Sequence, residues 1–124
     1  MKVLIAATDR DFLKSYKKLF TLEGFEVSTA FDGLQVMAWL KEKKYDLVIL
    51  DQGLPRVGAD RLAGLIRETK IPLLMLLGEE NNTSPEVGRN NGEESLCHPF
   101  FPEELFEKVR GLLEAREEEG KEAE

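Results

Sequence analysis

Three short, continuous runs of apolar residues, separated by segments of helical periodicity, constrain the fold of this chain more than any other feature. The runs are Val3–Ala7, Leu47–Leu50 and Ile71–Leu77. Hydrophobicity that is continuous rather than alternating is typical of strands buried on both faces, as in a parallel sheet covered by helices. A weaker run, Phe25–Ala30, follows Gly24, which we expect to end a helix as its C′ residue.

The segments between these runs carry apolar stripes with helical spacing. Two of them repeat the spacing i, i+1, i+4, i+7, i+8, namely Phe12, Leu13, Tyr16, Leu19 and Phe20, and Leu105, Phe106, Val109, Leu112 and Leu113. Shorter amphipathic stretches cover Leu34–Leu40 and Leu62–Ile66, and Pro102 suits the first position of a helix. Five alternating strands and helices predict a doubly wound α/β parallel sheet, with the functional site at the carboxyl ends of the strands.

The fourth helix of this pattern is weakly encoded. Its segment, GEENNTSPEVGRNNG, has Val87 as its one sizeable apolar residue, and Gly88 and several asparagines disfavour a helix. We expect a short or loose helix there, of one or two turns at most.

The length of 124 residues fits one domain, which we place at residues 1–118, with an acidic tail or the start of a linker at 119–124. The net charge of −7 argues against nucleic-acid binding, and the last eleven residues supply −4 of it. No apolar run is long enough to span a membrane, and the single cysteine, Cys97, is consistent with a reducing compartment. We therefore predict a cytoplasmic protein.

Asp51 is the residue most suggestive of chemistry. It directly follows the apolar run Leu47–Leu50 in YDLVILDQGLP, so it should emerge at the carboxyl edge of a buried strand. An aspartate at a strand end is, taken alone, more often a turn former or a helix cap.

The spacing of the other segments changes this interpretation. KVLIAATDRDFL, GFEVSTAFDGLQVMAWL, YDLVILDQGLP, IPLLMLLG and HPFFPEEL resemble, in order and separation, the five strand-centred blocks of response-regulator receiver domains of two-component signalling. The resemblance covers roughly residues 2–113 and implies a flavodoxin-like (βα)5 sheet, which we expect in the strand order 2-1-3-4-5. It also implies that Asp51 occupies the position of the aspartate that accepts a phosphoryl group from a histidine kinase.

The other functional positions that the resemblance implies are changed in this sequence. Ala7 and Thr8 replace an acidic pair that holds Mg²⁺, Leu77 replaces a hydroxyl residue, His98 replaces a lysine, and Ser95 replaces an aromatic residue. Magnesium gives up its hydration reluctantly and requires several oxygen ligands. We therefore predict no metal or other cofactor, with Mg²⁺ required only if the acceptor site still functions, and with Asp9 and Asp51 as weak candidate ligands.

Two of these residues keep alternative interpretations. Asp9 could be a displaced metal ligand. We favour the alternative, in which Thr8 or Asp9 is the N-cap of the first helix. Histidine is a weaker base than lysine, so His98 replaces the lysine charge only in part. It either hydrogen-bonds Asp51 in a weak pH-sensitive contact or is a structural residue beside a cis Pro99, the isomer that the resemblance implies. Cys97, Tyr16 and Trp39 are interpreted as packing residues, although exposure of Trp39 would change that interpretation.

Three hypotheses follow. The leading one is a degenerate receiver domain that is no enzyme and acts, without phosphorylation, through protein partners such as a histidine kinase or an output domain. The second is a conventional but slow phospho-acceptor that uses Asp51. The third, a small flavin- or nucleotide-binding protein, lacks a glycine-rich phosphate loop, since Gly33, Gly53 and Gly58 do not have the required spacing.

Overall fold

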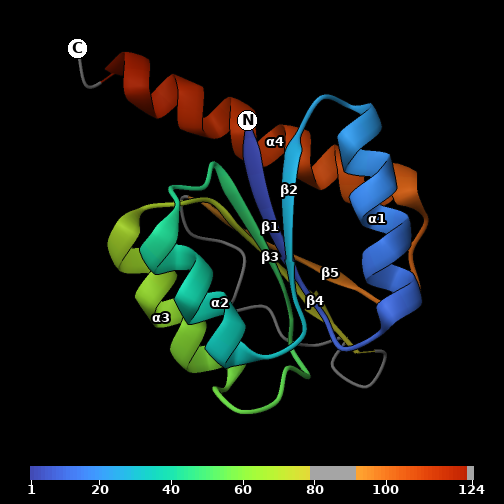
Figure 1. The fold of residues 1–124 in the computed structure, drawn as a ribbon. Helices are drawn as coiled ribbons and strands as arrows, with labels where there is room; N and C mark the ends of the chain where they lie inside the picture. Colours follow the sequence, from blue (N-terminus) through green and yellow to red (C-terminus); the bar gives the residue numbers. More distant parts are fainter. Residues whose placement is uncertain (79–91, 123–124) are drawn as a thin grey trace.

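The computed structural model describes residues 1–78 and 92–122, with side chains described as far as Arg116. Five parallel strands form one sheet in the order β2-β1-β3-β4-β5, which confirms the predicted fold and strand order (Figure 1). The strands are β1 (Lys2–Ala6), β2 (Glu26–Ala30), β3 (Leu47–Asp51), β4 (Leu73–Leu77) and β5 (Glu93–Cys97). The three apolar runs form β1, β3 and β4, the inner strands, whose residues face a helical layer on each side.

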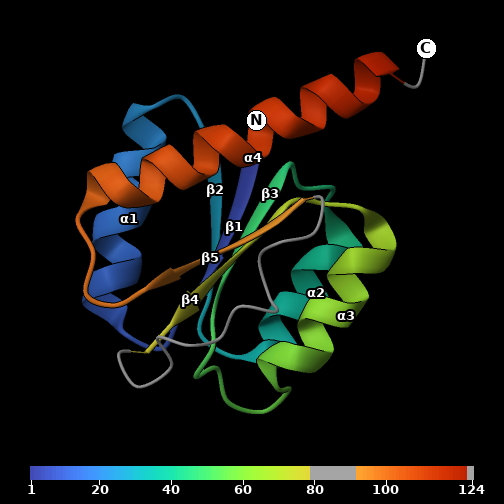
Figure 2. The ribbon, with the colours of Figure 1, turned by 180° about the vertical axis from the view of Figure 1, so that it is seen from behind.

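The described helices are α1 (Arg10–Leu22), α2 (Gly33–Glu42), α3 (Ala59–Thr69) and α4 (Pro102–Glu122). Helices α2 and α3 cover one face of the sheet, and α1 and α4 cover the other (Figures 1 and 2). Each face has its own hydrophobic cluster, built around Leu50 and Ile66 on the first and Phe20 and Ile49 on the second. The predicted short fourth helix falls outside the described residues, so α4 is the helix that follows β5.

The ends of the helices agree with the sequence signals. Gly24 follows α1 with a φ of 94°, the left-handed conformation expected of a C′ glycine, and Pro102 is the first residue of α4. Helix α4 continues through Glu122 and extends beyond the sheet (Figures 1 and 2). The domain boundary at residue 118 stays a prediction. Among the described helices, none is both long and apolar enough to cross a membrane.

Strand β5 lies at the edge of the sheet and is correspondingly less apolar than β4. Its first residue, Glu93, is buried and accepts a hydrogen bond of 2.7 Å from the Nε of Arg67 in α3. The hydrogen bond and the charge of Glu93 raise the pKa of Arg67, so this ion pair keeps a buried carboxylate compensated. A strand whose apolar pattern is interrupted by a charge is hard to recognise from sequence.

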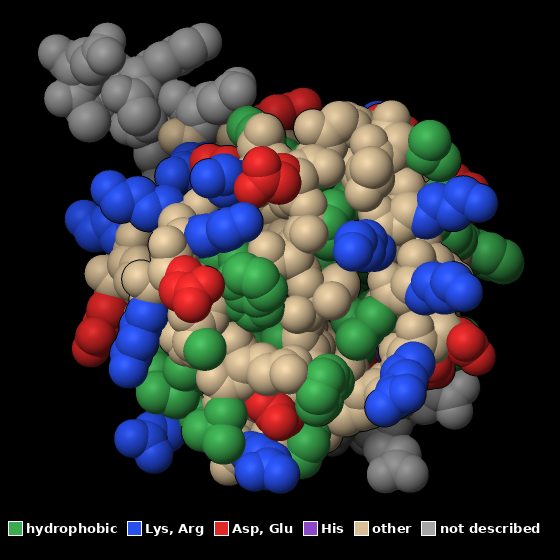
Figure 3. Space-filling view, in the orientation of Figure 1, with side chains coloured by type: hydrophobic (Ala, Val, Ile, Leu, Met, Phe, Trp, Pro, Cys, Tyr) green, Lys and Arg blue, Asp and Glu red, His purple; other side chains and the backbone are tan. Residues whose placement is uncertain are grey.

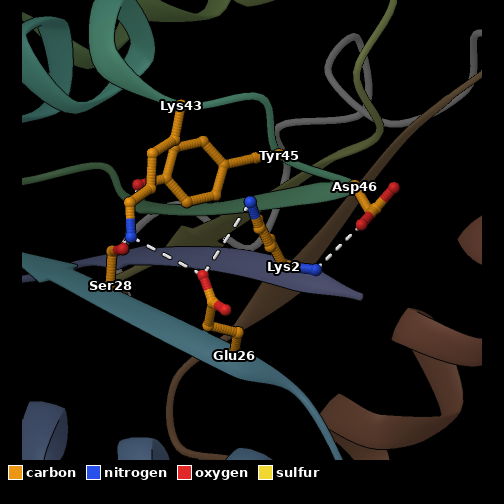
Figure 4. Close-up of polar contacts among 6 residues, drawn as sticks. All are labelled: Lys2, Glu26, Ser28, Lys43, Tyr45 and Asp46. Atoms are coloured by element: carbon orange, nitrogen blue, oxygen red, sulfur yellow. Dashed lines mark hydrogen bonds and ion pairs between the residues drawn. The ribbon is translucent and has the colours of Figure 1, made fainter.

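Polar contacts hold together the amino-terminal ends of the first three strands (Figure 4). The Tyr45 hydroxyl donates a buried hydrogen bond of 2.9 Å to the Ser28 Oγ, and the Lys2 amide donates one of 2.8 Å to the Asp46 carboxylate. Asp46 also pairs with Arg116 of α4 at 3.2 Å. These contacts fix the end of the sheet opposite to Asp51, so they position the site without forming part of it.

Gly33, the first residue of α2, lies against the loop between β3 and α3. Its amide donates a hydrogen bond of 3.0 Å to the Pro55 carbonyl, and a Cβ on this residue would lie 2.6 Å from both the Cβ and the carbonyl oxygen of Val57. Because part of the obstacle is backbone, it cannot be removed by a side-chain rotation. The absence of a side chain at Gly33 therefore allows the loop that follows Asp51 to pack closely on α2.

This contact predicts that Gly33→Ala destabilises the domain. We expect the free energy of unfolding to fall by about 2 kcal/mol, as for other overpacked sites. The matched control is Gly64→Ala within α3, where no neighbouring atom lies within 4 Å of the new Cβ and the change should stabilise the helix by about 0.5–1 kcal/mol. Urea denaturation of the three proteins measures both effects, and equal stability of Gly33→Ala and the wild type would contradict the close packing.

Candidate functional site

Parallel register brings the residues predicted for the site to one edge of the sheet. Ala6 is paired with Leu50, Asp51 with Leu76, and Leu77 with Cys97. The residues that end these strands or follow them, Ala7, Asp51, Leu77 and His98, therefore lie along the carboxyl edge. Ser95 instead lies within β5, paired with Met75, two residues before that edge.

Asp51 is the last residue of β3, and the chain turns directly after it. One carboxylate oxygen, Oδ1, accepts a hydrogen bond of 2.9 Å from the amide of Gly53. The other, Oδ2, lies 3.7 Å from Nε2 of His98. The side chain is 28% exposed, so the carboxylate is held in one orientation by the backbone and remains accessible to solvent.

The end of β1 supplies no carboxylate to this edge. Ala7 is buried and its amide donates a hydrogen bond of 3.0 Å to the Ala30 carbonyl, while Thr8 is exposed. Asp9 caps α1, because its Oδ1 accepts hydrogen bonds from the amides of Asp11 (2.9 Å) and Phe12 (3.2 Å). The capping interpretation of Asp9 is therefore supported by the geometry, and the carboxylate serves the helix.

The fourth strand supplies no hydroxyl group. Leu77 is buried and packs into the hydrophobic cluster beneath α2 and α3. Its carbonyl accepts a hydrogen bond of 2.8 Å from the amide of His98. The side chain has no donor that could stabilise an anion, so its contribution is the packing of the strand end.

His98 lies between Asp51 and a group of aromatic rings. The peptide bond from His98 to Pro99 is cis, as the family resemblance implies. The imidazole ring is 4.8 Å from the Phe100 ring and 6.1 Å from the Phe12 ring, measured between centroids. At 3.7 Å the contact with Asp51 is too long for a hydrogen bond, so the ring contacts favour the structural interpretation of His98.

The aromatic neighbours of His98, Phe12 and Phe100, were not predicted from the sequence to be part of the site. Tyr16 extends the group, with ring centroids 4.5 Å from Phe12 and 6.2 Å from Phe100. Burial, and secondarily the charge of Glu103, raise the pKa of Tyr16. The signal in the sequence was the pair of aromatic residues at i and i+4, which was assigned to packing alone. The rings that surround His98, those of Phe12, Tyr16 and Phe100, are therefore aromatic and carry no positive charge that could pair with Asp51.

The loop after β3 holds a second feature that the sequence analysis did not predict. Asp32, nearly buried, caps α2 by accepting a hydrogen bond of 2.8 Å from the Gln35 amide, and pairs with Arg56 at 3.5 Å. Arg56 has a φ of 78°, a conformation that favours glycine. Arg56 of the loop after β3 is thus paired with Asp32, which lies at the start of α2.

A magnesium ion does not fit the donor set at this edge. Mg²⁺ prefers octahedral oxygen ligation and is usually held by more than one carboxylate or by phosphate oxygens. Among the side chains of residues 1–78 and 92–116, no group of three or more His, Cys, Asp or Glu could hold a metal ion. Asp51 is flanked instead by Ala7 and Leu77, and the nearest other acid along β1, Asp9, is used as a cap.

Comparison with known proteins is consistent with this fold. A family model for the response regulator receiver domain matches residues 3–110. The transcriptional regulatory protein CpxR of Klebsiella pneumoniae is 32% identical over 114 residues, which are 90% of this chain and 49% of that protein. The response regulator MprA of Mycobacterium avium is 27% identical over 116 residues, covering 91% of this chain and 51% of its own length.

Solved structures agree with the sequence relatives. A putative response regulator from Chloroflexus aurantiacus has a TM-score of 0.78 at 25% identity and covers 90% of this chain and 96% of its own. The response regulator TrrA of Thermotoga maritima, in complex with Mg²⁺ and BeF, has a TM-score of 0.75 at 25% identity, with coverage of 90% and 98%. This chain belongs to the response regulator receiver domain family of two-component signalling. It spans about half the length of the curated relatives it matches.

The donor set predicts that carboxylates at the end of β1 would create metal binding. The double variant Ala7→Asp/Thr8→Asp should bind Mg²⁺ at least about tenfold more tightly than the wild type, equivalent to about 1.4 kcal/mol. The gain is expected because two further oxygen ligands would lie beside Asp51. Isothermal titration or amide chemical shifts during a Mg²⁺ titration measure the affinity.

Two controls accompany this prediction. Thr8→Asp alone changes an exposed residue and tests one ligand without burying a new charge at residue 7. Asp51→Asn in the double variant should abolish the gain. A wild-type affinity equal to that of the double variant would show that the present donor set already holds the ion.

Proposed function

We propose that this chain is a receiver domain that signals without phosphorylation, by binding other proteins, and that it catalyses no reaction of its own. The observation that carries the proposal is that Asp51 is flanked at the carboxyl edge by two buried apolar side chains, Ala7 and Leu77. These occupy the places where the family's phosphoryl chemistry requires a carboxylate and a hydroxyl group.

The magnitude of the missing interactions supports the proposal. Phosphoryl transfer is catalysed almost entirely by positioning and by stabilisation of charge on the transferred group. Removal of one preorganised donor typically raises the barrier by roughly 3 kcal/mol, and here the metal ligands, the hydroxyl donor and the lysine charge are all replaced. Even one such loss lowers the rate by more than about a hundredfold.

The coupling of Asp51 to a distant surface is also weakened. A ligand shifts a conformational equilibrium only by the difference in its interactions with the two states. Leu77 has no hydroxyl group that could turn towards a phosphoryl group, and Ser95 replaces the aromatic side chain that would follow it. The protein-binding surface of such a domain would therefore stay in one state.

A slow phospho-acceptor is the second candidate. It is favoured by the accessibility of Asp51 and by the position of His98, which could donate a hydrogen bond after a small movement. TrrA, a structurally similar protein at 25% identity, was solved in complex with Mg²⁺ and BeF.

Membership of the receiver domain family also suggests the class of partner. CpxR and YclJ are named as transcriptional regulatory proteins and are about twice as long as this chain, so a histidine kinase or an output domain is the expected partner class. In this proposal residues 1–118 form the domain and act in the cytoplasm, residues 119–124 are a tail or the start of a linker, and nucleic-acid binding belongs to an output domain.

Beryllofluoride with Mg²⁺ tests the proposal, because it mimics an aspartyl phosphate without requiring a phosphodonor. We expect amide chemical shifts of the wild type to remain unchanged at Asp51, Gly53 and Leu77 when both are added. The Asp51→Ala variant is the control for nonspecific effects. Saturable shifts in the wild type that disappear in Asp51→Ala would support the slow acceptor and overturn the proposal.

A further inference from the structure

Trp39 lies at the free edge of the sheet rather than in the core. Its Nε1 donates a hydrogen bond of 3.0 Å to the carbonyl of Thr29 in β2, and β2 is an outer strand of the sheet. The ring thus covers a backbone group of an exposed strand edge, which protects that edge from pairing with another chain. The side chain is partly buried and packs against the hydrophobic cluster under α2 and α3, as predicted, and the remainder of the side chain faces solvent.

An open hollow of about 430 Å³ lies beside this tryptophan. It is lined by Thr29, Phe31, Gln35, Ala38, Trp39 and Glu42, four of which form one stripe of α2. Phe31 in this lining is 53% exposed, and Leu34, one helical turn before Ala38 in α2, is 51% exposed. Exposed apolar side chains gathered around a hollow are typical of binding surfaces rather than of a solvated helix.

Basic side chains outnumber acidic ones in residues 1–44, which build α1, β2 and α2, although the chain as a whole is acidic and Glu42 lines the hollow itself. Residues 1–44 contain eight lysines and arginines and six acids, a net charge of +2 in a chain of −7. Asp9 and Asp32 cap helices, and Glu26 pairs with Lys2 and Lys43. Five other exposed lysines of residues 1–44 have no ion-pair partner within residues 1–78 and 92–116: Lys14, Lys17 and Lys18 of α1, and Lys41 and Lys44 at and after the end of α2.

Figure 3 shows Lys and Arg side chains spread over this face, with hydrophobic side chains among them. From this arrangement we propose that the surface made by α2 and the end of β2 binds an acidic, amphipathic segment of a partner protein. Its apolar side chains would fill the hollow beside Trp39 and Phe31, and its carboxylates would face Lys41 and the lysines around it. This deepens the proposed function by giving the chemistry of the partner.

Two other occupants fit less well. The acidic end of a second copy, from Glu114 on, matches the charge, but it contains no aromatic or large aliphatic residue to fill the hollow. A strand added to the edge of β2 would compete with the hydrogen bond from Trp39 to Thr29. An amphipathic segment that binds along α2 leaves the hydrogen bond from Trp39 to Thr29 intact.

Selection from a random-peptide display library, without Mg²⁺ or a phosphodonor, tests this proposal. Enriched peptides are expected to combine acidic residues with aromatic or large aliphatic ones. Because Trp39 is the single tryptophan, its fluorescence should change saturably when a synthetic copy of an enriched, tryptophan-free peptide is added. No enrichment, or enrichment of neutral or basic peptides, would overturn the proposal.

Exposed side chains allow the surface to be changed without disturbing the core. Phe31→Ser should weaken binding of the enriched peptide at least tenfold, and Lys41→Glu roughly fivefold. Arg110→Glu, the same charge change on an exposed residue of α4, should leave the affinity unchanged. Equal affinity in Phe31→Ser and the wild type would overturn the assignment of the surface.

Sedimentation of the wild type separates a partner from a second copy. We expect a monomer. A dimer that Phe31→Ser dissociates would assign the surface to self-association instead. None of these measurements depends on Asp51, so a failure here leaves the proposal of phosphorylation-independent signalling untouched, and phosphorylation of Asp51 would leave this surface untouched.

Discussion

The parallel register of β1, β3, β4 and β5 is the constraint on which the rest of the structure depends. It aligns the carboxyl ends of these strands, so that Asp51, Ala7, Leu77 and His98 share one edge of the sheet. In a doubly wound sheet this edge is where ligands bind. The function of the domain is therefore decided by which side chains follow the strands, and not by the strands themselves.

In this chain most of those side chains contribute to the packing of the fold, and they offer few groups that could stabilise the charge of a phosphoryl group at Asp51. Ala7 and Leu77 are buried in the two hydrophobic clusters, and His98 contacts aromatic rings. Asp51 keeps its position and the hydrogen bond from Gly53. The result is an acceptor-like carboxylate whose neighbours at the strand ends, Ala7 and Leu77, are apolar.

The sequence predicted the sheet well because its inner strands are buried on both faces, which leaves continuous apolar runs at Val3–Ala7, Leu47–Leu50 and Ile71–Leu77. The end of the run Leu47–Leu50 also predicted the position of Asp51, whereas the cis Pro99 was implied by the family resemblance. The edge strand β5 has no such run, because it carries Glu93 and its partner Arg67 is distant in sequence. The approach of Gly33 to Val57 and the exposure of Trp39 depend on tertiary packing, which periodicity within one helix does not report.

We propose that Asp51 has lost the surroundings that make an aspartate a phosphoryl acceptor. Incubation with acetyl phosphate and Mg²⁺, followed by intact-mass spectrometry, tests for this loss, with a phosphorylation-competent receiver domain treated in parallel. We expect a phosphoryl adduct on the competent domain and none on this chain. An adduct on the wild type that is absent from Asp51→Asn, formed at a rate comparable to that of the competent domain, would contradict it.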